Sequence, residues 1–331
     1  SLVGSDTLSG ALSRTSGEDA GTYVIGQGSL ANSNYAITYV SANLSVAQRA
    51  ITVTADAKSK EYGATDPTFT YAISSGSLVG ADSLSGSLGR ASGANVGTYA
   101  LNIGTLANAN YDITFVPANL TITQRPITVT AANKTKVFGS TDPSLTYSIT
   151  SGSLVGSDSL SGLLGRTSGA NVGTYALNVG SLANANYDIT FVPANLTITQ
   201  RPITVTAAAK SKEYGASDPT LTYSVTTGSL VGSDSLSGAL TRVSGDAVGT
   251  FAILRGTVDN TNYDITYVGA LLTISQRPIT VTADAKTKEY GATDPALTYA
   301  ITTGSLVGSD SLSGSLSRAS GEAVGTYAIG Q

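Results

Sequence analysis

A stretch of twelve residues returns through the chain at a constant interval, and this repeat constrains the fold more than any other feature. The sequence LTITQRPITVTA occupies 120–131, near-identical copies occupy 196–207 and 272–283, and a looser copy occupies 44–55. Each copy begins 76 residues after the one before it. A fixed period of this length is typical of tandem-repeat architectures. The 331 residues therefore predict one kind of module repeated several times, rather than two or three unrelated domains.

The repeated stretch has the pattern of two β-strands joined almost without a linker. On either side of Gln-Arg-Pro, apolar residues such as Ile122 and Val129 alternate with threonine. Alternation with a period of two, rich in β-branched residues, is typical of half-buried strands. Proline fixes φ and disfavours a helical conformation in the residue before it. We therefore predict that the last strand of one module runs directly into the first strand of the next.

The junction also supplies the candidate structural residues. Two interpretations of its arginine stay open: a clamp that holds neighbouring modules through backbone carbonyls or an aspartate, and a solvated linker charge. The first junction has Ala50 where the others have proline, so we expect it to be the most variable of the four. The junction residues are Arg49, Arg125, Pro126, Arg201, Pro202, Arg277 and Pro278.

The arginine spacing predicts where the modules begin and end. Three complete units occupy 49–124, 125–200 and 201–276. The back part of a unit occupies 1–48, and the front part of another occupies 277–331. Because both ends cut through a module, we expect the sequence to be a segment of a longer repetitive protein.

Each unit contains six or seven short alternating segments separated by turn residues. In the unit 49–124, Tyr71, Tyr99 and Tyr111 keep the same register as neighbouring aliphatic residues, so we expect their rings to fill the core. Strands at this spacing predict an all-β module of β-sandwich or β-grasp-like type. Short junctions that contain proline restrict bending, so we expect the modules to be arranged as an extended rod.

Composition argues against several classes of function. The chain has no His, Cys, Met or Trp, so the usual general base, metal ligand and thiol nucleophile are missing. We expect no catalytic residue, no metal site and no cofactor, and hence no enzyme. The formal net charge of -4 is spread thinly without a basic stripe, which argues against a nucleic-acid partner. No apolar run reaches the roughly 18 residues that a membrane-spanning helix needs.

Three aspartates in each unit are the strongest candidates for a bound cation. In the unit 49–124 they are Asp66, Asp82 and Asp112. Calcium usually takes about six to eight oxygen ligands from clustered carboxylates, whereas these residues are dispersed along the sequence. Asp-Pro and Tyr-Asp dipeptides stand where turns are needed, so turn formation is the favoured interpretation. Calcium binding at module boundaries is the alternative.

Another tyrosine recurs between the expected strands, at Tyr62, Tyr214 and Tyr290. We expect this residue at a module boundary or on the surface, where a row of aromatic rings would suit stacking on sugars. The expected partners are therefore adjacent modules of the same chain. Copies of the chain or an extracellular polysaccharide are the alternative partners.

Taken together, these motifs resemble the MBG domain of the YGX type. The modules of this family stand in tandem in large bacterial surface and biofilm-matrix adhesins, including haemagglutinin-like exoproteins. The resemblance covers the whole chain, but some copies depart from it, with Phe138 in place of the tyrosine, Phe251 in place of another and Ala36 in place of an aspartate. The motifs are Tyr62-Gly63, Asp66-Pro67, Leu78 to Asp82, Gly97 to Tyr99, Asn110 to Asp112 and Leu120 to Ile122.

The resemblance implies a structural or adhesive stalk and supplies no catalytic residue. We expect an extracellular protein at a bacterial cell surface, whose function is reach and stiffness. The lack of cysteine fits a secreted bacterial protein that crosses membranes unfolded, although a cytosolic protein can also lack it. The alternative is a binding function in which the repeats themselves hold a polysaccharide or one another. A row of exposed aromatic residues every 76 residues would favour that alternative.

Overall fold

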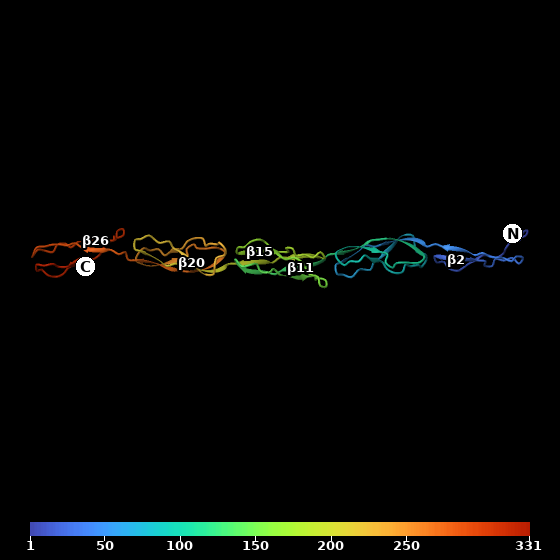
Figure 1. The fold of residues 1–331 in the computed structure, drawn as a ribbon, viewed down its shortest axis with the longest axis horizontal. Helices are drawn as coiled ribbons and strands as arrows, with labels where there is room; N and C mark the ends of the chain where they lie inside the picture. Colours follow the sequence, from blue (N-terminus) through green and yellow to red (C-terminus); the bar gives the residue numbers. More distant parts are fainter. The chain divides into compact units, whose positions relative to one another are not determined.

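The computed structural model describes residues 1–331 and consists of strands and their connections, without any helix (Figure 1). The expectation of an all-β fold is therefore confirmed. The molecule holds no helix with the length and hydropathy required to cross a bilayer.

The chain divides into two compact units. Unit 1 contains Ser1–Ala132, Leu145–Arg166 and Ala176–Ala194. Unit 2 contains Asn133–Ser144, Thr167–Tyr175 and Asn195–Gln331. The module 49–124 lies wholly in unit 1 and the module 201–276 wholly in unit 2, so each unit presents one complete example of the repeat.

The complete module of unit 1 has seven short strands. Six of them coincide with the alternating segments, which confirms the expected pattern. The seventh, β5, has the sequence KSKE and lacks apolar alternation, so the pattern did not predict it. The seven strands are β4 (Arg49–Ala55), β5 (Lys58–Glu61), β6 (Tyr71–Ser75), β7 (Gly89–Arg90), β8 (Gly97–Asn102), β9 (Tyr111–Val116) and β10 (Asn119–Thr123).

These strands form two sheets, and each sheet mixes antiparallel and parallel pairs. The three-stranded sheet has the order β6-β4-β9, in which β4 is antiparallel to β6 and parallel to β9. The four-stranded sheet has the order β5-β10-β8-β7, in which β10 is parallel to β5. Parallel strands cannot be joined by a short hairpin and need a long connection between them. Each sheet therefore pairs a strand from the beginning of the module with a strand from its end. Strand β5 is an edge strand of this sheet, and its Lys60 is half-buried in an ion pair with Asp66.

The core of this module lies between the inward faces of both sheets. Ile51 and Val53 from β4 pack in one buried cluster with Leu120 and Ile122 from β10. Full burial of each such side chain stabilises the fold by about 1.5–3 kcal/mol. Along β10, buried Leu120 and Ile122 alternate with exposed residues, so the period-two pattern identified them correctly.

The three tyrosines expected in this core have different environments. Tyr111 is buried, as expected. Tyr71 and Tyr99 are half-buried and pack against the edge of the core cluster. The Tyr99 ring is kept at the edge because its hydroxyl donates to the carbonyl of Asn95, at 2.8 Å, and the Arg90 guanidinium lies over its face. The expectation that these rings fill the core is therefore confirmed for Tyr111, whereas Tyr71 and Tyr99 contribute to the core only at its edge.

The junction between modules is as short as the sequence predicts. Gln124 is the one residue between β10 and the next strand, β11 (Arg125–Ala131). Pro126 lies within β11, a central strand, although proline cannot donate a ladder hydrogen bond. At Pro126, β11 pairs only with β16, where Pro126 lies opposite Asp188. The antiparallel pairing of β11 with β13 begins at Thr128. The missing N–H therefore leaves no gap in the ladder.

The remaining strands of unit 1 repeat the same pattern. Strand β11 lies between an antiparallel and a parallel neighbour, in the order β13-β11-β16. These strands are β1 (Ser13–Arg14), β2 (Gly21–Gly26), β3 (Ala42–Val46), β11, β13 (Tyr147–Ser151), β14 (Gly165–Arg166) and β16 (Tyr187–Val192), and β15 (Gly173–Asn178) contributes its last three residues.

Unit 2 contains a second complete module with the same two sheets, ordered β20-β18-β23 and β19-β24-β22-β21. Its strands are β18 (Arg201–Ala207), β19 (Lys210–Glu213), β20 (Tyr223–Thr227), β21 (Thr241–Arg242), β22 (Gly249–Leu254), β23 (Tyr263–Val268) and β24 (Ala270–Ser275). The others are β12 (Lys134–Val137), β17 (Asn195–Thr199), β25 (Thr280–Ala283), β26 (Tyr299–Thr303), β27 (Ser317–Arg318) and β28 (Ile329–Gly330).

Candidate functional site: the contact between successive modules

In unit 1, Tyr62 of one module contacts Tyr187 and Asp158 of the next. The two rings meet edge to face, with centroids 5.5 Å apart and an interplanar angle of 78°. The Tyr62 hydroxyl donates to Oδ2 of Asp158 at 2.9 Å, and the Tyr187 hydroxyl donates to the same oxygen at 2.7 Å. The backbone N–H of Val155 donates to the Tyr187 oxygen at 2.7 Å. One carboxylate therefore connects tyrosines from two modules.

The shared carboxylate changes the titration of both phenols. Hydrogen bonding to Asp158 is the main cause that raises the pKa of Tyr62, and burial adds to it. Burial is the main cause that raises the pKa of Tyr187, followed by its hydrogen bond to Asp158. Both effects disfavour a phenolate beside a carboxylate.

Gly63, which follows Tyr62, lets the two modules approach closely. Its φ of +79° lies in the left-handed region, which a residue with a side chain adopts only at a cost. A Cβ at this position would also collide with Cγ2 of Val155 in the next module. The Tyr-Gly dipeptide therefore fits the neighbouring module in two ways: the ring packs on Tyr187, and the bare backbone accommodates Val155.

Two amides complete the contact in unit 1. The side chain of Asn186 accepts from the backbone N–H of Val96 at 3.0 Å and donates to Oδ1 of Asn95 at 3.1 Å. The junction residue Gln124 donates from Nε2 to the carbonyls of Ala185 and Tyr187, each at 3.1 Å. The sequence analysis had not assigned these two amides to the contact, although the Asn-Tyr-Asp motif contains one of them and the junction contains the other.

The same amide contact is found at another place in unit 1. The side chain of Asn110 accepts from the backbone N–H of Ala20 at 2.8 Å and donates to Asp19 at 2.8 Å. Gln48 donates to the carbonyl of Ala109 at 2.9 Å. The contact is therefore a repeated feature of the chain, and it has the same period as the strands.

The junction arginines hold their own module rather than clamping two modules together. In unit 1, Arg125 donates from Nε to the carbonyl of Ser153 at 3.1 Å, and Arg49 donates to the hydroxyl of Ser77 at 3.1 Å. In unit 2, Arg201 donates to the carbonyl of Ser229 at 3.0 Å. Nη1 of Arg201 lies 3.5 Å from the carbonyl oxygen of Phe138, which is at the limit of a hydrogen bond to the preceding module.

The remaining junction residues lie in the first strands of their modules or just before them. Pro202 is the counterpart of Pro126 and pairs with Asp264 of β23. Pro278 precedes β25, and Arg277 beside it donates to the hydroxyl of Ser305 at 3.3 Å. The arginine is therefore neither a clamp nor a free charge in most copies, because it closes a turn of its own module.

The three aspartates considered for calcium have different environments, and two of them have structural partners. Asp66 forms ion pairs with Lys60 at 2.6 Å and Arg90 at 2.5 Å, and the Arg90 hydrogen bond is the main cause that lowers the pKa of Asp66. Asp82 accepts from the hydroxyl of Tyr111 at 2.7 Å. Asp112 is exposed on the outward face of β9. No three acidic side chains lie together as a group that could hold a metal ion.

Unit 2 contains a version of the contact in which phenylalanine replaces tyrosine. The rings of Phe138 and Tyr263 lie 5.5 Å apart at an interplanar angle of 79°. Tyr263 donates to Asp234 at 2.7 Å, and a Cβ at Gly139 would collide with Val231. Ring packing and close approach are therefore kept, whereas the hydrogen bond from the preceding module is lost.

The other two tyrosines of this series also lie in unit 2. Tyr214 is half-buried, and a hydrogen bond to Asp310 is the main cause that raises its pKa. A cavity of about 600 Å³ beside it is lined by Tyr214, Val307 and Asp310, among others. Tyr290 is 78% exposed. The structure therefore places Tyr62 and Tyr214 at module contacts and leaves Tyr290 on the surface.

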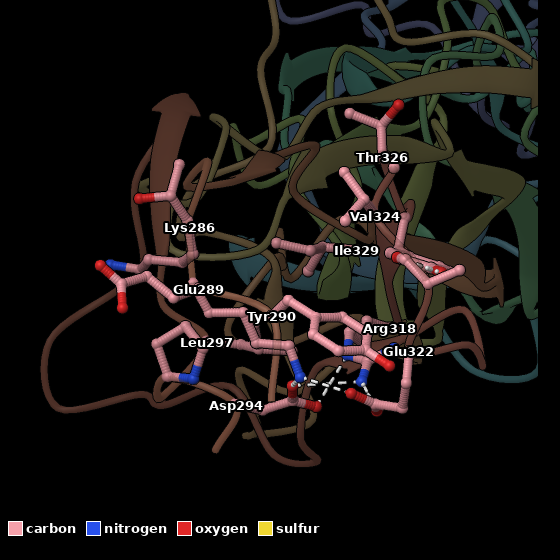
Figure 2. A pocket seen from close by; sticks show the side chains of 16 residues that line it. Lys286, Glu289, Tyr290, Asp294, Leu297, Arg318, Glu322, Val324, Thr326 and Ile329 are labelled. Atoms are coloured by element: carbon pink, nitrogen blue, oxygen red, sulfur yellow. Dashed lines mark hydrogen bonds and ion pairs between the residues drawn. The ribbon is translucent and has the colours of Figure 1, made fainter. Parts of the chain in front are cut away.

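A second cavity, of about 320 Å³, lies beside Tyr290 (Figure 2). Asp294 and Glu322 form ion pairs with Arg318 at its edge (Figure 2). In the module 201–276 the equivalent segments are β19 and β22, and β24 lies between them with Leu272 buried. The cavity thus corresponds to the position of a core strand, so we do not assign a ligand to it.

These observations define the class of protein: an array of small two-sheet β modules, in which an aromatic residue followed by glycine contacts the next module. The model of one family, described as MBG domain (YGX type), matches 1–45, 51–121, 127–197, 203–273 and 279–331. The chain therefore belongs to the MBG domain (YGX type) family, with five tandem copies, and the resemblance in the sequence is confirmed. No curated protein matches this chain.

Proposed function

We propose that this chain is the structural stalk of a large secreted bacterial adhesin or extracellular matrix fibre. Its function is then to give reach and stiffness to a binding region elsewhere. The observation that supports the proposal best is the contact of Tyr62 and Gly63 with the following module. A chain of modules joined only by flexible linkers would have no use for such a contact.

Stiffness results from three restraints that act at the same junction. One residue separates the strands, so little backbone is free to bend. The aromatic pair and the glycine resist separation of the modules by packing. The amides of Gln124 and Asn186 resist rotation, since their hydrogen bonds are directional. The partners in this proposal are the adjacent modules of the same chain.

The proposal also assigns a location and excludes catalysis. A stalk acts outside the cell, which agrees with the lack of cysteine, since such a chain needs no disulfide formation after export. No residue is given a catalytic, cofactor or metal-binding role in this proposal, and most side chains singled out in the sequence, such as Tyr62, Asp66 and Asp82, have structural partners.

One observation favours the second candidate, in which the repeats bind a polysaccharide or one another. Tyr147 and Tyr299 occupy equivalent positions in the repeat and are 38% and 45% exposed. Their counterparts Tyr71 and Tyr223 are half-buried, so the rings are exposed in alternate copies only. Exposed rings at this position of the repeat could stack on sugars. They lie on β13, β26 and β6, away from the contact, so the two functions do not exclude each other.

Small-angle scattering of the whole chain tests the stalk. A module of this size spans roughly 30–40 Å, so five stacked modules give a maximum dimension on the order of 150–200 Å. The dimension should stay the same when the salt concentration is raised, because the contact is made by ring packing and by hydrogen bonds from uncharged donors. A compact particle, or a broad distribution of maximum dimensions in solution, would contradict the proposal. Binding of a polysaccharide that Tyr147→Ala and Tyr299→Ala abolish would support the second candidate.

A further inference from the structure

The composition of the chain leaves tyrosine as its main target for oxidation. Cysteine and methionine, which react first in most proteins, are absent, and so are tryptophan and histidine. The chain has 17 tyrosines. A one-electron oxidant that meets this protein will therefore remove electrons from phenol rings, and the product depends on which rings are in contact.

Tyr62 and Tyr187 are such a pair, and they come from different modules. Their ring centroids are 5.5 Å apart, so an edge of one ring touches the face of the other. Tyr62 is half-buried and gives an oxidant a point of entry, whereas Tyr187 is only 3% exposed. A radical formed on Tyr62 has Tyr187 as its nearest aromatic neighbour.

The carboxylate of Asp158 is placed to assist this chemistry. Oxidation of a phenol releases its proton, and both phenol oxygens already donate to Oδ2 of Asp158. The acceptor is therefore in position before the electron leaves. The raised pKa values of Tyr62 and Tyr187 agree with this requirement, since protonated phenols need a base when they are oxidised.

We propose that Tyr62 and Tyr187 are a site of dityrosine formation, which joins two modules covalently when a peroxidase-type catalyst and hydrogen peroxide oxidise the chain. Each phenol loses one electron and one proton. The two radicals combine through ring carbons next to the hydroxyl groups, and the hydrogens on those carbons move to the phenol oxygens or to solvent. The chain loses two hydrogen atoms in total, and one hydrogen peroxide is reduced to two waters.

The edge-to-face arrangement is compatible with this bond. The two rings of a biaryl are twisted relative to each other. Starting from an interplanar angle of 78°, the rings of Tyr62 and Tyr187 need only rotate for the bond to form. Rotation about χ2 of a tyrosine is soft compared with other side-chain torsions. The cross-link would make a contact between modules that can open permanent. Its formation depends on the contact between Tyr62 and Tyr187 and does not depend on the proposed stalk function.

The chain contains its own matched control for this cross-link. Phe138 and Tyr263 in unit 2 have the same ring separation and an interplanar angle of 79°. Phe138 has no phenolic hydroxyl and cannot form a phenoxyl radical. The two contacts therefore differ in chemistry while they share geometry.

The test is to oxidise the whole chain with a haem peroxidase and hydrogen peroxide at low protein concentration, and to map cross-links by mass spectrometry after proteolysis. We expect a linked pair of peptides about 2 Da lighter than their sum, from the loss of two hydrogens, with fragments that place the bond between Tyr62 and Tyr187. Tyr62→Phe should abolish this product. Tyr71→Phe, which changes a tyrosine a few residues away, should leave it unchanged.

A gain of product gives the sharpest evidence. Phe138→Tyr should add a second intramolecular cross-link, from position 138 to Tyr263, and a misfolded variant could not imitate this result. Tyrosines oxidised elsewhere without a Tyr62–Tyr187 product would overturn the proposal. So would a Tyr62–Tyr187 product found only in covalent dimers, because the bond would then join two chains. Failure of the stalk in scattering would leave the cross-link result unaffected.

Discussion

The contact at Tyr62 in unit 1 and the contact at Phe138 in unit 2 are two solutions to one packing problem. The ring geometry is the same within 1°, and glycine follows the ring in both. Phe138 is 6% exposed, whereas Tyr62 is half-buried with its hydroxyl on Asp158. Shape is therefore the constant property of the contact. The hydrogen bond is added where tyrosine is present, and a fully apolar ring can be buried more deeply without it.

The largest effect is expected when the buried tyrosine ring that is present in each contact, Tyr187 or Tyr263, is removed. Tyr187→Ala and Tyr263→Ala should each destabilise the fold by about 3–5 kcal/mol, since a large buried ring leaves a cavity. Chemical denaturation monitored by circular dichroism measures this change. Similar losses at the two positions would show that the neighbouring ring contributes the same packing whether or not it has a hydroxyl. A loss below about 1 kcal/mol at either position would argue against its role in the core.

The next effect concerns the glycine. Gly63→Ala should cost about 2–5 kcal/mol, because a side chain at positive φ is strained and Cβ also collides with Val155. Gly291→Ala is the matched control: its φ is +80°, but nothing lies within 4 Å of its added Cβ, so only about 1–2 kcal/mol is expected. Thermal melts compare the two variants. Equal losses would mean that the modules do not approach closely at Gly63.

A smaller effect is expected when the two ring types are exchanged. Tyr62→Phe removes one donor to Asp158, which keeps its hydrogen bond from Tyr187, so the melting temperature should fall by less than it does for Gly63→Ala. Phe138→Tyr places a donor near Asp234 and should not lower it. The two variants together test whether the hydrogen bond from Tyr62 to Asp158 adds stability beyond that of the ring packing. A large loss for Tyr62→Phe would show that the two contacts are different in kind.

The smallest effect is a difference in alkaline sensitivity. The pKa of Tyr62 is raised in the folded chain, so its stabilising contribution is present below the pKa of an unfolded tyrosine, near 10, and is lost as pH rises through the higher folded value. Tyr62→Phe should therefore reduce the loss of stability in that window, measured by melts at rising pH. Tyr62 also raises the pKa of Tyr187, so the comparison reports the Tyr62 hydroxyl together with its effect on Tyr187. Identical pH profiles would contradict the Asp158 contact.

Much of each module could be predicted from local pattern. Period-two alternation identified β4, β8, β9 and β10 because one face of each strand packs on the core. It failed for β5, because the strand has no apolar residue, although its side chains alternate between half-buried and exposed. Parallel pairing of β4 with β9 was also missed, because the paired residues stand about sixty positions apart and no turn connects them.

The candidate site divides in the same way. The sequence drew attention to Tyr62 because it recurs in the repeat, and it suggested a module boundary for that residue. It did not indicate Asp158 or Tyr187 as its partners, since they lie 96 and 125 residues further along the chain. The arginines were prominent in the repeat, yet Arg125 serves a turn of its own module.

What the sequence by itself determined is the all-β class, the period of the repeat and a junction no longer than Gln-Arg-Pro. Alternation, turn chemistry and proline act over a few residues, so a single copy of the repeat carries that information. Only the tertiary structure decided which strands are parallel neighbours and what the tyrosine-glycine pair contacts. Both depend on side chains that meet after the backbone has closed, and Gly63 is required by a valine 92 residues away.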